Sequence, residues 1–539
     1  MAQFILEYGP IAQAVLRPTC SEVMGEDTPP LAPGEYVTWA VDRHVGCGRF
    51  QYVYVLALCW TSGVVCMQTF ANMFAAEKVP WHAACPAGNA SCTVLKEPEN
   101  CTVPLEEWRV DQPGLSLRGD LKLVCERHHL VPMLGSLFFV GFAVGVLMAG
   151  IVSDRYGRRL AYFVSYACLT VGGFIAPVAP SFFWYAVARM LVGAGVASSG
   201  LVAYIWATEF LATTKRGVMS WLPNVTFSIG QILVSPLAYT VPNWRPFLLG
   251  CQGVVLTGLL YSCCLRESPQ WLAVVGRREE AYSVICTMAA KNGRSPPPPP
   301  EENVRADDES SDGEEPQAGE RGFLSEICDP RLRFRFVVIC FNWFSISFAF
   351  YGLSMFSPNL PFSVYVANAV SGLVAVPFYL MAPILIDAKW CGRRGAISGS
   401  YFVGSGCLFA SNAISDETLS LIVYYVGNGA LSLAFAVLYV WAAELFPTTI
   451  RARSMSIQSM FARLGAMSSP FVVDIGQKNA ALALLIFATP CAICGALDLC
   501  LPETRARKLP NTTDDIFSDD GESESEPPSP CSSSDDEGK

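Results

Sequence analysis

About twelve apolar segments, each roughly 20 residues long, divide this chain of 539 residues and constrain its fold more than any other feature. They begin near Phe50, Pro132, Leu160, Phe182, Val218, Trp244, Phe334, Tyr365, Gly395, Leu419, Ser454 and Ala480. A helix of roughly 20 apolar residues spans a hydrocarbon core about 30 Å thick. Only 16% of the residues are charged, against roughly 25% in soluble domains. The sequence therefore predicts an all-α membrane protein with about twelve transmembrane helices.

Basic residues in the short loops between these segments set the expected orientation. One alternate set of loops carries Arg155, Arg158, Arg159, Lys215, Arg216, Lys389, Arg393, Arg394, Arg451 and Arg453. The other set is nearly bare, with Arg245 and Lys478 as its visible exceptions. Because basic loops stay in the cytoplasm, we expect a multi-pass plasma-membrane protein with both termini cytoplasmic. No cleaved signal peptide is expected near the N-terminus.

Five regions follow from this pattern. They are a cytoplasmic N-terminal segment (1–49), a first six-helix half (50–265), a cytoplasmic loop (266–334), a second six-helix half (335–501) and an acidic cytoplasmic tail (502–539). The net charge of −10 comes from two Ser- and Pro-rich acidic stretches, 301–326 and 514–539. Such stretches cannot bury enough apolar surface to fold, and without them the remaining chain is mildly basic.

The long outer loop, 75–131, contains four cysteines and two N-glycosylation sequons. The cysteines are Cys85, Cys92, Cys101 and Cys125, and the sequons carry Asn89 and Asn100. The sequons and the charge rule independently predict that this loop lies outside the cell. In that oxidising compartment we expect disulfides, with all three pairings open. No metal site is expected, because the histidines of the loop lack ligand-like spacing.

The loop chemistry is repeated in the two halves. Asp154-Arg-Tyr-Gly-Arg-Arg159 follows the second span, and Asp387-Ala-Lys-Trp-Cys-Gly-Arg-Arg394 follows the eighth. Glu209 and Glu444 likewise follow the fourth and tenth spans. Matching loops at matching places predict two related halves, as in many transporters. The second copy is two residues longer between its Asp and Gly, so the halves have diverged.

These motifs resemble the major facilitator superfamily and, within it, the organic ion transporters of solute carrier family 22. The superfamily resemblance rests on Gly150-x-x-x-Asp154-Arg-x-Gly-Arg-Arg159 and on Arg189-x-x-x-Gly193-x-Gly195-x-Ala197. The family resemblance adds Phe50-Gln51, Pro80-Trp-His-Ala-Ala-Cys85, Leu123-Val-Cys125-Glu, Glu267-Ser-Pro-Gln-Trp271-Leu and Leu501-Pro-Glu-Thr504. The resemblance covers about residues 50–509 and implies the major facilitator fold.

The resemblance also implies a cytoplasmic gate built from the charged residues of these loops. The gating residues would be Asp154, Arg155, Arg158, Arg159, Arg189, Glu209, Asp387, Arg393, Arg394, Glu444 and Arg451. We expect Asp154 to face the positive N-terminus of a neighbouring helix. Arg158 or Arg159 would pair with Glu209, and Glu444 with Arg451 would be the second-half equivalent. Arg189 lies inside a span and requires a buried partner or a water-filled cavity.

The substrate cavity should lie between the halves near the membrane midplane. Positions that resemble the cavity-lining aromatics of organic cation transporters are Tyr204, Phe227, Trp343, Phe350 and Tyr351; ordinary helix packing is the alternative for each. Cation carriers of the family typically have aspartate at the position of Arg463, whereas anion and carnitine-type carriers have arginine. A guanidinium for a carboxylate and aromatic faces for an ammonium favour a zwitterionic, carnitine-like or anionic substrate. Asp474 is expected to be a solvated charge near the helix end.

Two classes of function stay open. The first is a transporter of small organic ions that works by alternating access, with an organic cation carrier as the alternative substrate class. The second is a membrane receptor or scaffold whose acidic tail recruits partners or kinases. Arg189 and Arg463 inside spans favour transport. No enzyme, cofactor, metal or nucleic-acid partner is expected, sodium or proton coupling is open, and the partners are a small organic ion and the lipid bilayer.

Overall fold

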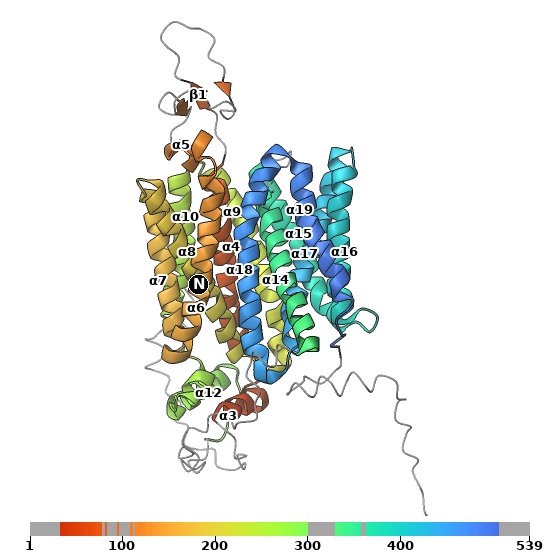
Figure 1. The fold of residues 1–539 in the computed structure, drawn as a ribbon. Helices are drawn as coiled ribbons and strands as arrows, with labels where there is room; N and C mark the ends of the chain where they lie inside the picture. The colour runs from red at the N-terminus through yellow and green to blue at the C-terminus, as the bar shows by residue number, and fades with distance from the viewer. Residues whose placement is uncertain are drawn as a thin grey trace, which may run out of the picture.

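The computed structural model describes residues 33–77, 81–83, 94–95, 108–110, 114–299, 329–356 and 363–505. Twelve long helices form the body of the described chain (Figure 1). Those of the first half are α4 (Arg49–Ala75), α6 (Leu130–Tyr156), α7 (Arg158–Val178), α8 (Phe182–Glu209), α9 (Leu222–Thr240) and α10 (Trp244–Ser262). Those of the second half are α14 (Pro330–Phe356), α15 (Val364–Asp387), α16 (Gly392–Ala413), α17 (Glu417–Glu444), α18 (Thr448–Lys478) and α19 (Ala480–Asp498). The predicted all-α fold with twelve helices is confirmed.

The twelve helices differ in polarity. Within the described residues, eight are long and apolar enough to cross a membrane by length and composition. The other four, α9, α10, α16 and α18, are of similar length but more polar. Two of them, α9 and α18, pack against α15 and α6 of the other half. Polar residues on these helices can find partners across the interface between the halves, which explains their lower hydropathy.

Glycines of the fourth span set how closely the first-half helices pack. A Cβ on Gly193 would collide with the carbonyl oxygen of Phe138 on α6, and one on Gly195 would press against Leu169 on α7. From the other side, a Cβ on Gly141 of α6 would collide with the carbonyl oxygen of Met190. The glycines of this motif therefore act as close-packing positions between membrane helices.

Smaller elements cap the bundle at its two ends, which we call the loop face and the motif face. The loop face, at the top of Figure 1, carries a three-stranded antiparallel sheet in the order β2-β1-β3. Its strands are β1 (Trp81–Ala83), β2 (Val94–Leu95) and β3 (Trp108–Val110), followed by α5 (Leu117–Asp120) and η3 (Cys125–Arg127). The motif face, at the opposite end, carries α3 (Pro33–Ala40), η1 (Val41–Val45), η4 (Thr213–Ser220), α11 (Pro269–Val274) and α12 (Arg278–Lys291).

The region predicted as a cytoplasmic loop contains ordered helices at its start. Ser268 caps α11 by accepting a hydrogen bond from the Trp271 amide at 3.2 Å, and Pro269 occupies the first turn, where its missing N–H costs nothing. The following proline run is anchored as well. Tyr282 donates to the Pro297 carbonyl at 2.9 Å, and Tyr36 donates to the Pro298 carbonyl at 2.6 Å. Burial raises the pKa of Tyr36 well above its usual range.

Candidate functional site

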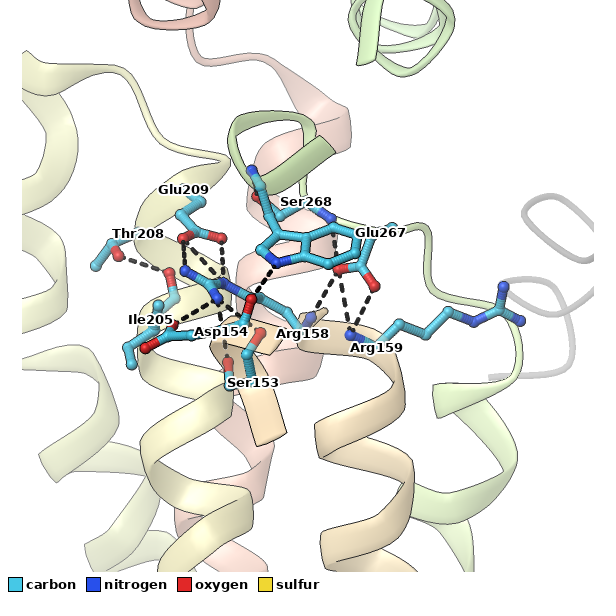
Figure 2. A network of polar contacts seen from close by, with 10 residues as sticks. Ser153, Asp154, Arg158, Arg159, Ile205, Thr208, Glu209, Glu267 and Ser268 are labelled. Atoms are coloured by element: carbon cyan, nitrogen blue, oxygen red, sulfur yellow. Dashed lines mark hydrogen bonds and ion pairs between the residues drawn. The ribbon is translucent and has the colours of Figure 1, made fainter. Parts of the chain in front are cut away.

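Arg158, the first residue of α7, is the centre of a polar network on the motif face (Figure 2). Its guanidinium contacts Glu209 at the end of α8, with Nη2 2.9 Å from Oε1 and Nε 3.1 Å from the same oxygen. Its Nη1 donates to the Ser153 carbonyl at 2.8 Å and lies 2.9 Å from Asp154 Oδ1. Of the two arginines predicted to reach Glu209, the structure places Arg158 there. The guanidinium thus ties the ends of α6 and α8 to the start of α7.

Glu267 supports this network from the segment after α10. Its carboxylate accepts hydrogen bonds from the backbone amides of Arg158 at 2.9 Å and Arg159 at 3.1 Å (Figure 2). Burial raises the pKa of Glu267, and hydrogen bonds from the amides of Ser268, Arg159 and Arg158 work against that rise. The sequence analysis quoted Glu267 only as part of a family motif. The structure shows that it satisfies free N–H groups at the start of α7.

The second half repeats the network with nearly the same spacing. Arg393 Nε lies 3.1 Å from Glu444 Oε2, and this pair is 51 residues apart in sequence, as is the pair in the first half. Glu503 accepts from the backbone amides of Arg393 and Arg394, each at 2.9 Å. The Thr504 hydroxyl donates to Glu444 Oε2 at 2.6 Å. The additional residues of this loop leave the arginine, the glutamate and the capping acid in equivalent places.

One predicted gating pair lies differently from the sequence expectation, and two gating aspartates are exposed. Asp154 is 78% exposed and contacts Arg158 one turn on, and Asp387 is 75% exposed and lies 3.4 Å from Arg393. Among the described residues, neither carboxylate has an ion pair with the other half. Glu444 pairs with Arg393, whereas Arg451 donates its Nε to the Phe446 carbonyl at 3.2 Å. Arg393 is the arginine that reaches the Glu444 carboxylate, so the predicted Glu444–Arg451 pair is corrected to Glu444–Arg393.

The remaining arginines of the two loops use backbone or aromatic partners. Arg155 lies over the ring of Tyr156, 5.5 Å from its centroid. Arg159 Nη2 donates to the Cys263 carbonyl at 2.8 Å, and Arg394 Nη1 donates to the Leu501 carbonyl at 3.4 Å. Each of these contacts holds the loop to its own half.

Arg189 is buried in the first half, with a side chain only 2% exposed. Its Nη1 donates to the Gln68 carbonyl at 3.3 Å, and its guanidinium lies over the Phe138 ring, 4.7 Å from the centroid. Its Nε has no hydrogen-bond partner. The buried partner that the sequence required is therefore a backbone carbonyl and an aromatic face, and no carboxylate of the described residues pairs with it.

Aromatic side chains gather where the two halves meet. Phe350 on α14 packs on Phe227 of α9 with ring centroids 6.0 Å apart and on Phe435 of α17 at 5.2 Å. Trp343 packs edge-on against Tyr439 at 4.6 Å. The cluster comprises Phe139, Phe142, Phe227, Trp343, Phe350, Tyr351, Phe435 and Tyr439.

Exposure divides the predicted cavity residues. Tyr204 is 46% exposed and Tyr439, which the sequence analysis missed, is 44% exposed. Trp343, Phe350 and Tyr351 are buried by their neighbours. The positive charge of Arg463 interacts with the phenol groups of both Tyr351 and Tyr439. Tyr439 belongs to an apolar stretch of α17 and carries no motif, so only its place in the fold identifies it.

Arg463 on α18 lies at the edge of this aromatic cluster, half-buried. Its guanidinium carbon is 4.2 Å from the centroid of the Phe142 ring on α6, in the opposite half. Its Nη2 donates to Ser459 Oγ at 3.4 Å, a long contact within one helix. Its buried Nε has no hydrogen-bond partner, and among the described residues Arg463 forms no ion pair. A positive charge with free donors therefore faces the junction of the two halves.

The two halves are joined near the loop face by polar contacts. His128 Nε2 lies 2.7 Å from Asp474 Oδ1, so the charge expected to be solvated is paired and only 26% exposed. Tyr365 donates to Glu77 Oε2 at 2.9 Å, and burial raises the pKa of Glu77 while this hydrogen bond opposes the rise. Deeper in the bundle, the amide of Asn368 donates to the Gln231 carbonyl at 2.9 Å. These contacts join the two halves near the loop face.

Several predicted sites lie outside the described residues. They are Cys85, Cys92, Cys101 and the sequon residues Asn89 and Asn100. Cys125 opens η3 in a positive-φ conformation, with φ of 54°. The disulfide pairing and the glycosylation sites remain predictions. In the described part of the chain, no group of three or more His, Cys, Asp or Glu side chains could hold a metal ion.

Comparison of the sequence with known proteins identifies a family of transporters. Residues 48–514 match the model of the "Sugar (and other) transporter" family. The chain is 31% identical to the "Organic cation transporter protein" of Drosophila melanogaster, over 73% of this chain and 72% of that one. It is 30% identical to "Solute carrier family 22 member 15" of Xenopus tropicalis (72% of each chain) and 27% identical to "Organic anion transporter 3" of Pongo abelii (88% and 92%).

Solved structures show the same fold. The proton:xylose symporter XylE of the major facilitator superfamily superposes with a TM-score of 0.58 at 15% sequence identity. The superposition covers 86% of this chain and 99% of the symporter. At this identity the likeness concerns the fold alone.

Proposed function

Because the chain belongs to the sugar (and other) transporter family and, within it, to solute carrier family 22, we propose that it carries small organic ions with a carboxylate group. It is a membrane transporter and not an enzyme. Alternating access is its mechanism, with two similar halves moving about a site between them. Within the class of small organic ions, a zwitterion of the carnitine kind or an organic anion is the proposed substrate.

The observation that carries this proposal is the unpaired guanidinium of Arg463. A charge taken from water costs several kcal/mol unless it gains a partner, and the described residues supply only the Phe142 ring and a long hydrogen bond to Ser459, without a carboxylate. A substrate carboxylate would accept hydrogen bonds from the guanidinium group. The half-buried position between α6 and α18 would let the substrate contact both halves at once. The names of the relatives include both organic cation and organic anion transporters, so they support either sign of charge.

Two partly exposed tyrosine rings support the zwitterionic choice. Tyr204 and Tyr439 present rings that are about half exposed, and an aromatic face attracts an ammonium group. A carnitine-like molecule could place its carboxylate on Arg463 and its trimethylammonium on these rings. We propose that both tyrosines and the buried Trp343, Phe350 and Tyr351 behind them shape the cavity.

We further propose that the motif face is cytoplasmic and that the conformation described is open toward it. In this proposal the loop face is closed by the contacts of Glu77 and His128 with the second half and by the contact of Asn368 with Gln231 of the first half. The carboxylates of Asp154 and Asp387 are exposed rather than engaged by the other half. In this proposal the motif loops latch the cytoplasmic face only when the transporter faces outward.

The proposal is tested by radiotracer uptake in oocytes that display the protein at their surface. Carnitine, tetraethylammonium and p-aminohippurate are compared with and without sodium, against water-injected cells. We expect carnitine or p-aminohippurate to accumulate and tetraethylammonium not to. Uptake of tetraethylammonium alone would favour the cation carrier, and no uptake of any of the three would favour a receptor or scaffold.

Substitution of Arg463 then separates binding from folding. Arg463→Gln should lower uptake of the carboxylate substrate about ten- to hundredfold, because a hydrogen bond to a charged group contributes about 1.5–3 kcal/mol. The matched control is Arg453→Gln, an exposed arginine on the same helix, which should keep uptake near the original rate. Equal loss in both variants would contradict the assignment of Arg463.

A further inference from the structure

Asp498, the last residue of α19, is a carboxylate buried inside the second half. Its side chain is 0% exposed. Its helix packs against α14, α16 and α18. Nothing in the proposed transport site uses it, since that site lies between the halves. A carboxylate in such a place needs a chemical reason to stay there.

Hydrogen bonding accounts for only part of this carboxylate. Asn342 on α14 donates its Nδ2 to Asp498 Oδ1 at 2.8 Å and also to the Val338 carbonyl at 2.9 Å. Both N–H groups of that amide are therefore used. Two buried acceptors remain without a partner: Asp498 Oδ2 and Asn342 Oδ1. They belong to the same two side chains that the Nδ2–Oδ1 hydrogen bond already joins.

The surroundings offer no positive charge. Among the described residues, no Lys, Arg or His forms an ion pair with Asp498. The titratable groups that face it are the Tyr401 phenol on α16 and the Cys494 thiol one turn back on α19. Both are weak acids, and α14 contributes the neutral Asn342. No charged group of α18 acts on it. An ionised Asp498 would be a buried charge without compensation, which costs far more than a buried neutral acid.

We propose that Asp498 and Asn342 form a proton-binding site. A proton on Oδ2 removes the buried charge and turns that oxygen into a donor. The donor can then close a cyclic acid–amide pair, with Oδ2–H directed to Asn342 Oδ1 and Nδ2–H directed to Asp498 Oδ1. One proton satisfies both unpartnered atoms. Sodium fits less well, because hard cations take about six or more oxygen ligands, and these two side chains offer two free ones.

The site is connected to the substrate path through α14. Asn342 is followed in sequence by Trp343, which packs on Phe435 and Tyr439 of the aromatic cluster. Loss of the proton would leave two facing oxygens and a buried charge, and α14 and α19 would have to separate or admit water. If the proposed transport function holds, the site therefore couples proton binding to the position of α14.

The test uses the purified full-length protein and needs no substrate. Infrared spectra are recorded while pH is raised from mildly acidic to alkaline, and the C=O stretching band of a protonated carboxylic acid is followed. We expect this band in the unmodified protein and its loss as pH rises. Asp498→Asn should lack the component of the band that belongs to Asp498, whereas any component from Glu77 or Glu267, whose pKa values burial also raises, should remain. This variant keeps the fold, because an amide at 498 can pair with Asn342 as the protonated acid does.

Two further variants make the assignment specific. Asn342→Ala should shift the frequency of the band, because the acid loses its acceptor, and this variant also serves if Asp498→Asn fails to fold. Asp416→Asn is the matched control: Asp416 is an exposed N-cap that accepts from the Leu419 amide at 2.7 Å, and asparagine caps equally well. The control should keep the band unchanged.

The contrary results are distinct. A band that is the same in Asp498→Asn as in the unmodified protein, or one that is absent from the unmodified protein throughout, overturns the proposal. A carboxylate band that responds to sodium at constant pH would assign the site to sodium instead. Where a transported substrate is found, its uptake should depend on pH in the original protein and lose that dependence in Asp498→Asn. An infrared band that titrates without any transport would leave the proton site standing and remove only the transport function.

Discussion

Arg189 and Arg463 place two guanidinium groups inside the bundle without a carboxylate partner among the described residues. They differ in access. Arg189 is 2% exposed and is surrounded by Gln68, Phe138 and other first-half residues, whereas Arg463 is half-buried where the two halves meet. Only the accessible guanidinium can replace its lost hydrogen bonds to water with hydrogen bonds to a substrate. At the residue scale, this difference assigns Arg463 to the substrate and Arg189 to the interior of one half.

Replacing Arg189 with methionine tests that division. An unpaired buried charge is costly, and apolar replacement of buried charges is often neutral or stabilising by about 1–4 kcal/mol. We therefore expect Arg189→Met to keep or raise the thermal unfolding temperature of the purified protein in detergent. Arg189→Ala should lower it, because the side chain that packs on Phe138 is removed without replacement. A clear loss of stability in Arg189→Met would mean that the guanidinium itself holds the first half together.

At the scale of single elements, Glu267 and Glu503 perform the same task in the two halves. Each lies outside the helix that it supports, and each accepts hydrogen bonds from two backbone amides in the first turn of that helix, α7 or α16. The separations in sequence are 109 and 110 residues. A negative group at a helix N-terminus is stabilising because it satisfies free N–H groups and opposes the helix dipole.

Removal of these caps should destabilise each half separately. Glu267→Ala and Glu503→Ala are each expected to cost about 1–2 kcal/mol, the range for loss of a helix N-cap. Because the two caps lie in different halves and share no partner, their effects should add in the double variant. Thermal unfolding of the three variants measures this. A double variant no less stable than the single variants would contradict this additivity and would mean that the two caps do not stabilise their halves independently.

The sequence predicts which helices exist better than it predicts what meets across them. The starts of α8, α10 and α19 lie at the predicted residues Phe182, Trp244 and Ala480, because a bilayer demands long apolar runs. Glu267 and Glu503 were visible as motif letters, but their partners lie about 110 residues away, and spacing alone does not identify them. Pro297 and Pro298 precede the acidic stretch 301–326, which composition predicts to be unfolded, and their hydrogen bonds to Tyr282 and Tyr36 are likewise not visible in the sequence.

For the whole molecule, the sequence predicts a fold but not which face of it is closed. An alternating-access transporter uses one sequence in two arrangements of its halves, so no motif encodes a single state. In the proposed conformation the loop face is closed by contacts such as His128–Asp474 and Tyr365–Glu77. The sequence predicts a solvated Asp474, because it does not reveal that the partner of this aspartate is His128 of the other half. Contacts between the two halves therefore cannot be predicted from the sequence and require the structure.

Weakening these contacts should shift the balance of states. Each hydrogen bond contributes about 1 kcal/mol, so loss of both in His128→Ala with Tyr365→Phe should change the ratio of closed to open loop faces by roughly thirtyfold. Spin labels carried by unnatural amino acids at Arg127 and Lys478, exposed residues of opposite halves, report the separation by electron paramagnetic resonance. The unmodified chain should give one short distance, and the double variant should add a longer one.

The matched control is Arg277→Ala, which breaks an exposed ion pair within the motif face and should leave the distances as they were. Distances that stay unchanged in the double variant as well would mean that deeper contacts, those of Asn368 with Gln231 and Ser235, hold the loop face closed.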